Sequence, residues 1–191
     1  MTSGARKLSV LTLLGLCSAL VSASGAWKTF ESKKAGYRVQ YPASWYLIDP
    51  RVEVLNILNF PPTERVQGVV IRAGGAEISA TNAPPGTRTL DGWIHDNLMG
   101  ATADETLEVP VSKPERGGCS NIKRVSWSTD VGGTSPAYIV QTVYYCSTVY
   151  GFYSVGVMNW RDDPNQNEFR EVALRIAQSL RAMPSAASRV R

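Results

Sequence analysis

The sequence has few of the side chains from which catalytic and metal sites are built. Its 191 residues include one histidine and three cysteines. It contains no glycine-rich phosphate loop, no Gly-x-Ser-x-Gly nucleophile motif and no Cys/His spacing typical of a metal site. The sequence therefore predicts a protein that is not an enzyme and that holds no metal or cofactor.

Clustered basic residues and long hydrophobic runs are also lacking after residue 26. The formal charge of +4 comes from scattered Lys and Arg residues. Nucleic-acid-binding domains concentrate such residues on one face or carry a recognisable module. A membrane-spanning helix needs about 20 apolar residues. We therefore expect no nucleic-acid partner and no membrane span in residues 27–191.

Residues 1–26 have the three parts of a secretory signal peptide. Arg6 and Lys7 precede an apolar run over residues 8–21, and small residues follow it. An uncleaved anchor would need a longer run, and lipidation at Cys17 would need a small residue in place of Leu16. The pattern predicts cleavage, with the mature chain beginning between Ser24 and Trp27 and working in the periplasm or outside the cell.

Residues 27–184 predict a single α+β domain, and residues 185–191 a disordered tail. Short runs of β-branched and aromatic residues, broken by Gly and Pro, are typical of antiparallel strands with tight turns. We expect strands at residues 27–32, 37–41, 45–48, 52–60, 69–72, 76–81, 122–128, 137–148 and 152–160. The last three should form a meander that turns at Gly132-Gly133 and at Tyr150-Gly151.

Two segments have helical spacing instead. Residues 90–99 carry apolar side chains on one face and are followed by Gly100 as a C-terminal cap. Residues 169–183 place Phe169, Val172, Ile176, Leu180 and Met183 in one stripe. Asp163 is the expected N-cap of this second helix, with Pro164 in its first turn and Gln166 completing a capping box.

Three polar features could carry chemistry, and each has a simpler interpretation. His95 lies one helical turn after Asp91, but no nucleophile is identifiable, so a surface position is expected. Residues 163–167 begin like a calcium loop, and the pattern then fails where glycine and glutamate are required. The acidic residues Asp104, Glu105 and Glu108 are expected in a solvated loop.

The cysteine content predicts a disulfide between Cys119 and Cys146. These are the two cysteines that remain after the signal peptide, and an exported chain matures where disulfides persist. A hairpin turning on Gly132-Gly133 would place them directly opposite each other on antiparallel strands. A pair of free or redox-active thiols is the alternative, and the lack of Cys-x-x-Cys spacing disfavours it.

The segment Tyr37-Arg38-Val39-Gln40-Tyr41-Pro42-Ala43-Ser44-Trp45 resembles the Y-x-x-x-Y-P-x-x-W opening of Mog1/PsbP-like domains. The middle helix, the long hairpins and the closing helix follow in the family's order. The resemblance implies an antiparallel β-sheet with helices packed on its faces, as an α/β/α sandwich. Members of this family are mostly non-enzymatic, so the resemblance also implies a protein without catalytic activity. The exported bacterial members are the most similar in kind.

The combined expectation is an exported, non-catalytic binding or assembly factor whose partner is a protein or an envelope component. A small hydrolase-like or ligand-processing enzyme centred on His95 is the alternative. Two loops are the expected partner-binding surfaces, and their residues are Phe60, Pro61, Pro62 and Arg65 in the first, and Pro84, Pro85 and Arg88 in the second.

Overall fold

The computed structural model describes residues 25–49, 54–64, 71–112, 114–132 and 137–184. Nearly all of the predicted signal peptide, the predicted tail and Arg65 therefore lie outside the described residues, as do parts of the strands expected at 52–60 and 69–72. Every structural statement below refers to the described part of the chain.

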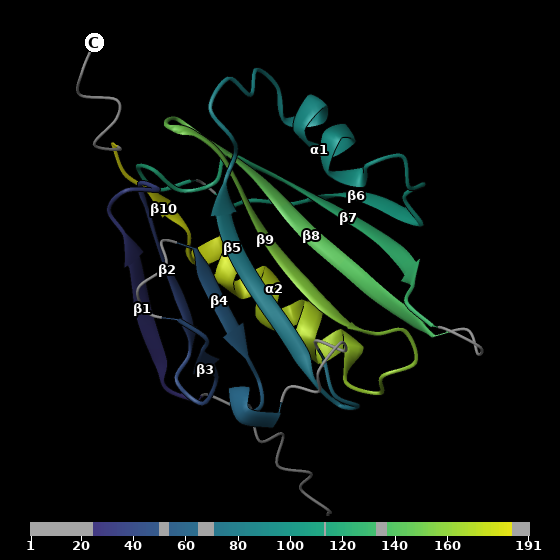
Figure 1. Ribbon diagram of the computed structural model, residues 1–191. Helices are drawn as coiled ribbons and strands as arrows, with labels where there is room; N and C mark the ends of the chain where they lie inside the picture. Colours follow the sequence, from purple (N-terminus) through teal and green to yellow (C-terminus); the bar gives the residue numbers. More distant parts are fainter. Residues whose placement is uncertain (1–24, 50–53, 65–70, 113, 133–136, 185–191) are drawn as a thin grey trace, which may run out of the picture.

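The larger of two antiparallel sheets has seven strands in the order β3-β4-β5-β9-β8-β7-β6 (Figure 1). Its strands are β3 (Tyr46–Leu47), β4 (Leu55–Leu58), β5 (Ala76–Asn82), β6 (Glu105–Val109), β7 (Asn121–Asp130), β8 (Tyr138–Thr148) and β9 (Gly151–Trp160). Strands β7, β8 and β9 form the predicted meander and are its longest members. A short 3₁₀-helix, η1 (Pro62–Glu64), follows β4.

The smaller sheet has three strands in the order β1-β2-β10. Its strands are β1 (Trp27–Ser32), β2 (Tyr37–Pro42) and β10 (Arg181–Ala182). β10 contributes only two residues, which pair with Arg38 and Tyr37 of β2. On its other side, the Ala182 amide donates to the Gly117 carbonyl at 2.7 Å. The last described strand is thus held between β2 and the connection that leads from β6 to β7.

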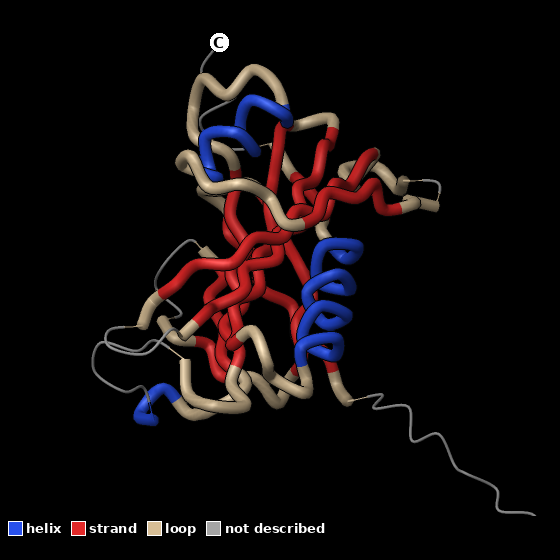
Figure 2. The backbone as a smooth tube through the Cα atoms, turned by 90° about the vertical axis from the view of Figure 1, so that its right-hand side faces the viewer, coloured by secondary structure: helices blue, strands red, loops and turns tan. Residues whose placement is uncertain are grey.

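The two helices, α1 (Leu90–Leu98) and α2 (Gln166–Ser179), lie on opposite faces of the seven-stranded sheet (Figure 2). Side chains alternate between the faces of a strand. Ile122, Tyr144 and Cys146 accordingly join the core under α2, while Val125 and Tyr145 join the cluster under α1. The predicted α+β architecture, with helices on both faces of an antiparallel sheet, is confirmed.

The motif at the start of β2 builds the main core. Tyr37, Val39 and Tyr41 all point inward and are buried. The Tyr37 hydroxyl donates to the Ala80 carbonyl at 2.6 Å and accepts from the Leu55 amide at 3.0 Å, which joins the small sheet to β5 and β4. Burial raises the pKa of Tyr37 to about 12, so the phenol stays neutral and remains a donor.

Several predicted boundaries are wrong. α2 begins at Gln166 with Asn165 as its N-cap, so Pro164 precedes the helix and the capping box around Asp163 is absent. α2 ends at Ser179, because the chain turns there into β10. α1 ends at Leu98, where Met99 takes a left-handed conformation (φ 49°) ahead of Gly100.

The predictions for two segments near the large sheet are also wrong. Glu105 and Glu108 belong to strand β6 and not to a loop. Each of these acids pairs with a base of β7, Glu105 with Arg124 and Glu108 with Lys123. Ile71 and Arg72, expected in a strand, lie outside any strand.

Candidate functional site

The two predicted partner-binding loops lie at opposite ends of β5 and do not form one site (Figure 1). Phe60 is 1% exposed and packs with Leu58 and Ile71 in a small cluster, so its side chain is not on the surface. Pro61 and Pro62 beside it are half-buried, and Pro84, Pro85 and Arg88 in the other loop are exposed. A binding role for either loop stays a prediction.

His95 is exposed on α1, as expected for a surface residue. The nearby Asp91 carboxylate accepts a hydrogen bond from the Lys123 ammonium at 2.7 Å, which ties α1 to β7. This bond raises the pKa of Lys123 above its ordinary value. The Asp91 carboxylate is therefore engaged by a lysine, and it accepts no hydrogen bond from His95 among the described residues.

The residues at 163–167 form a turn that leads into α2. The Asp163 carboxylate accepts from the Asn165 amide at 2.8 Å, and its carbonyl accepts from the Gln166 amide. Within the described ranges there is no group of three or more His, Cys, Asp or Glu residues that could hold a metal ion. No helix there is long and apolar enough to cross a membrane.

The disulfide between Cys119 and Cys146 is present, with the Cα atoms 5.4 Å apart. The register predicted for it is wrong, because Cys146 faces Ile122 and Cys119 lies just before β7. The bridge therefore anchors the β6–β7 connection, residues 110–120, to β8. Both sulfurs are buried in the core beneath α2.

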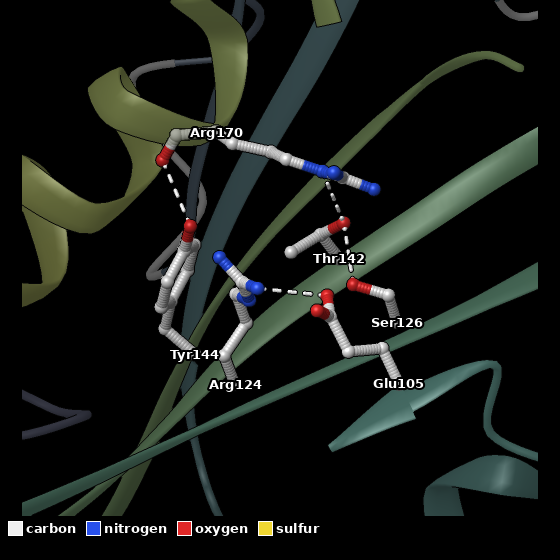
Figure 3. A network of polar contacts seen from close by, with 6 residues as sticks. All are labelled: Glu105, Arg124, Ser126, Thr142, Tyr144 and Arg170. Atoms are coloured by element: carbon white, nitrogen blue, oxygen red, sulfur yellow. Dashed lines mark hydrogen bonds and ion pairs between the residues drawn. The ribbon is translucent and has the colours of Figure 1, made fainter. Parts of the chain in front are cut away.

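A polar network links α2 to strands β8 and β7 of the seven-stranded sheet (Figure 3). The Arg170 side chain crosses over β8, and its Nε donates to the Thr142 hydroxyl, which shares a hydrogen bond with Ser126. The Tyr144 hydroxyl donates to the Arg170 carbonyl at 3.0 Å. Thr142 and Ser126 are both buried, so this network is a support for the helix and offers no open site.

Two adjoining clefts lie on the surface where α2 runs into β10. The first cleft, of about 360 Å³, is lined by residues of β1, β2, α2 and β10 and by the β6–β7 connection. Its polar side chains are Thr29, Arg38, Gln40, Glu115, Ser179 and Arg181. The second cleft, of about 250 Å³, is lined mainly by described residues of the β6–β7 connection, among them Cys119 of the disulfide.

The wall between the clefts is the ion pair of Arg181 and Glu115, which lines both. Nε of Arg181 donates to a Glu115 carboxylate oxygen at 3.0 Å, and Nη2 forms an ion pair with the same oxygen at 2.8 Å. Its Nη1 donates to the carbonyls of Gln178 and Leu180. The guanidinium is thus fixed from two sides, and we take the pair of clefts as the candidate binding site.

Sequence reasoning did not find this site. Arg38 lies inside the quoted motif, but its role depends on β10, a strand of two residues with no periodic signal of its own. Glu115 is placed at the cleft by two nearby anchors, the Gly117 carbonyl, which accepts from Ala182 of β10, and Cys119, which is bonded to Cys146 of β8. Gly117 has φ 79°, and a Cβ there would lie 2.4 Å from the Ala182 carbonyl oxygen, so this approach requires glycine.

Comparisons with known proteins add little to this geometry. No family model and no curated protein sequence matches the chain. Among solved structures, a protein from Bacteroides thetaiotaomicron is similar at 14% sequence identity with a TM-score of 0.48, over 81% of this chain and 48% of the other. The chain therefore spans about half the length of that protein. A likeness at this level implies nothing about function.

Proposed function

We propose that this protein is an exported, non-catalytic binding or assembly factor acting on a protein or envelope component, in the periplasm or outside the cell. The observation that carries the proposal is the pair of clefts held in shape by a disulfide. Binding sites are mostly preformed concave surfaces with a few fixed polar groups. The Arg181–Glu115 wall provides such groups, and Cys119–Cys146 anchors the connection that carries Glu115.

The disulfide also supports the proposed compartment. Disulfides persist in secreted and periplasmic proteins and are rare in the cytosol. Amino-terminal sequencing of the protein recovered from its host tests export, with a start between Ser24 and Trp27 as the expected result. A chain that still begins at Met1 in the membrane fraction would contradict it.

Membership of the Mog1/PsbP-like family is part of the same proposal. It is supported by the burial of Tyr37, Val39 and Tyr41, which makes the quoted motif a core-forming strand. The order of elements, with α1 between β5 and β6 and with α2 after the meander, also agrees with it.

Capture experiments with an envelope extract test the binding function. Gln178→Trp places a large ring in the second cleft, and Glu171→Trp places the same ring on the same helix away from both clefts. We expect a partner retained by the wild type and by Glu171→Trp to be lost with Gln178→Trp. Equal retention by all three proteins would remove the second cleft from the binding surface.

The non-catalytic part of the proposal has a separate test. His95→Ala should leave every activity of the protein unchanged, because Asp91 is held by Lys123 and does not orient the imidazole. A reaction whose rate collapses by orders of magnitude on His95→Ala, with an unchanged circular dichroism spectrum, would show that the protein is an enzyme.

A further inference from the structure

We propose that the first cleft binds a phosphate group, which Arg38 and Arg181 hold between them. This inference rests on the proposed binding function and names the chemistry of its ligand.

Arg38 and Arg181 are direct cross-strand partners in the antiparallel pairing of β2 with β10. Their neighbours Tyr37 and Ala182 point into the core, so both arginine side chains point to the outer face. Like charges directly opposite each other are unfavourable. A bound anion between the two guanidinium groups would turn this repulsion into attraction.

The two arginines differ in how far they are already paired. Most of the Arg181 guanidinium is taken up by Glu115 and by the carbonyls that end α2. Arg38 is exposed, and its guanidinium has no hydrogen-bond or ion-pair partner in the part of the chain that the structure describes. Arg38 therefore supplies the open donors, and Arg181 supplies a charge whose position is fixed.

Two carboxylates lie close enough to the arginines to reduce the positive charge of the cleft. Glu115 balances Arg181 but is itself largely exposed, with 75% of its side chain open to solvent. Glu31 faces Arg38 across β1 and β2, yet the two side chains form no ion pair within the described residues and Glu31 does not line the cleft. Among the charged groups that line the cleft, two are positive and one is negative.

Donors outnumber acceptors on the walls of this cleft. The Thr29 hydroxyl and the Gln40 side-chain amide make no hydrogen bond to other described residues, and both line the cleft with Arg38. The Ser179 hydroxyl already has two hydrogen-bond partners. It accepts from the backbone N–H of Gln40 and donates to the Ile176 carbonyl. A phosphate offers several acceptor oxygens and two negative charges, and guanidinium groups match its geometry. A carboxylate would leave more of these donors unpaired.

The test is a titration of the purified, disulfide-intact protein with inorganic phosphate, followed by amide NMR and calorimetry. We expect shifts at the amides of Thr29, Arg38, Gln40 and Arg181. Arg38→Gln should weaken binding about tenfold to a hundredfold, as expected for hydrogen bonds between charged groups. Arg161→Gln removes the same charge far from the cleft, beside Tyr138, and should bind like the wild type.

Acetate and lipid vesicles are the comparison ligands in the same binding experiments. Acetate binding as tight as phosphate would overturn the preference for a phosphate group. Binding to phosphatidylglycerol vesicles but not to phosphatidylcholine vesicles, reversed by inorganic phosphate, would identify a lipid headgroup as the source. Binding of phosphate but not of vesicles would identify a soluble phosphate group as the source, and failure to bind either would overturn the proposal.

The partner experiment separates this inference from the proposed function. An envelope partner captured equally by the wild type and by Arg38→Gln, with phosphate binding absent from both, would overturn the phosphate site and leave the binding factor standing. Phosphate binding that Arg38→Gln weakens, without any cleft-dependent partner, would support the site and contradict an assembly role.

Discussion

The two helices cover opposite faces of one sheet, but they are integrated into the molecule to very different degrees. α2 buries Ala173, Ile176 and Ala177 completely, and its core also includes the inner face of the three-stranded sheet. In α1, Leu90 and Trp93 are still 8% and 5% exposed, and Ile94 and Leu98 are only partly buried.

The attachments of the helices differ in the same way. α2 is held by the Arg170 network, and the chain beyond it continues directly into β10. α1 is held by an edge-to-face contact of Trp93 with Tyr145 and by the ion pair of Asp91 with Lys123. From this contrast we expect the α2 side to provide most of the stability, and α1 to open locally at a lower free-energy cost.

The largest expected effect comes from the centre of α2. Ile176→Ala removes a fully buried side chain and should lower the free energy of unfolding by about 2–5 kcal/mol in a denaturant titration. Gln178→Ala, an exposed position on the same helix, should change it by less than about 0.5 kcal/mol. Equal effects at both positions would place this face of α2 in solvent.

Removal of the disulfide should have the next largest effect. Cys119→Ser combined with Cys146→Ser opens a loop with a sequence separation of 27 residues, and the loop-entropy relation predicts a loss of about 3.5 kcal/mol. Thiol titration of the unfolded, unreduced wild type should find no free thiol in the mature chain. Two free thiols per monomer would refute the bridge.

Tyr37→Phe tests the link between the two sheets. It leaves the Ala80 carbonyl and the Leu55 amide without their partner in a buried place, which costs about 1–3 kcal/mol per unsatisfied group. Tyr41→Phe is the matched control, because no hydrogen bond from Tyr41 to other described residues is lost, and its effect should be much smaller. A Tyr37→Phe protein as stable as the wild type would mean that the hydrogen bonds of Tyr37 contribute nothing to the link between the two sheets, which the bond from the Tyr153 hydroxyl to the Gly36 carbonyl would still join.

The smallest expected effect lies on α1. Asp91→Asn should cost about 0.2–1 kcal/mol, because the ion pair with Lys123 is at the surface. The raised pKa of Lys123 means that this contribution is present at neutral pH and is lost as the pH rises through that raised value. A stability difference between Asp91→Asn and wild type that persisted above that pH would assign the effect to something other than the ion pair.

The sequence was most informative where structure follows local periodicity. The apolar stripe of α2 and the runs of β-branched and aromatic residues at β7, β8 and β9 predicted these elements. Phe169 and Ile176 of the stripe are buried, while the buried Ala173 and Ala177 were not predicted. Strand β6 was not predicted because Glu105, Leu107 and Glu108 are exposed and give no alternation. Its strand character comes from pairing with β7.

The candidate site depends on pairings that no local pattern contains. The disulfide partners were predictable from the number of cysteines, but the hairpin register was not, and the structure pairs Cys146 with Ile122. Arg38 and Arg181 become neighbours only through β10, whose two residues are placed by β2 and by Gly117. A contact of this kind requires the assembled fold.

The position of β10 also constrains the order in which the chain can fold. The first strands emerge from the ribosome early, yet β2 receives its second neighbour only when Arg181 and Ala182 arrive, and Met183 then donates to the carbonyl of Gly36. Contacts between residues so distant in sequence form slowly because loop closure must precede them. The smaller sheet is therefore completed only once residues 181–183 can reach β2, and a nascent chain stopped before residue 181 would keep an open edge on β2.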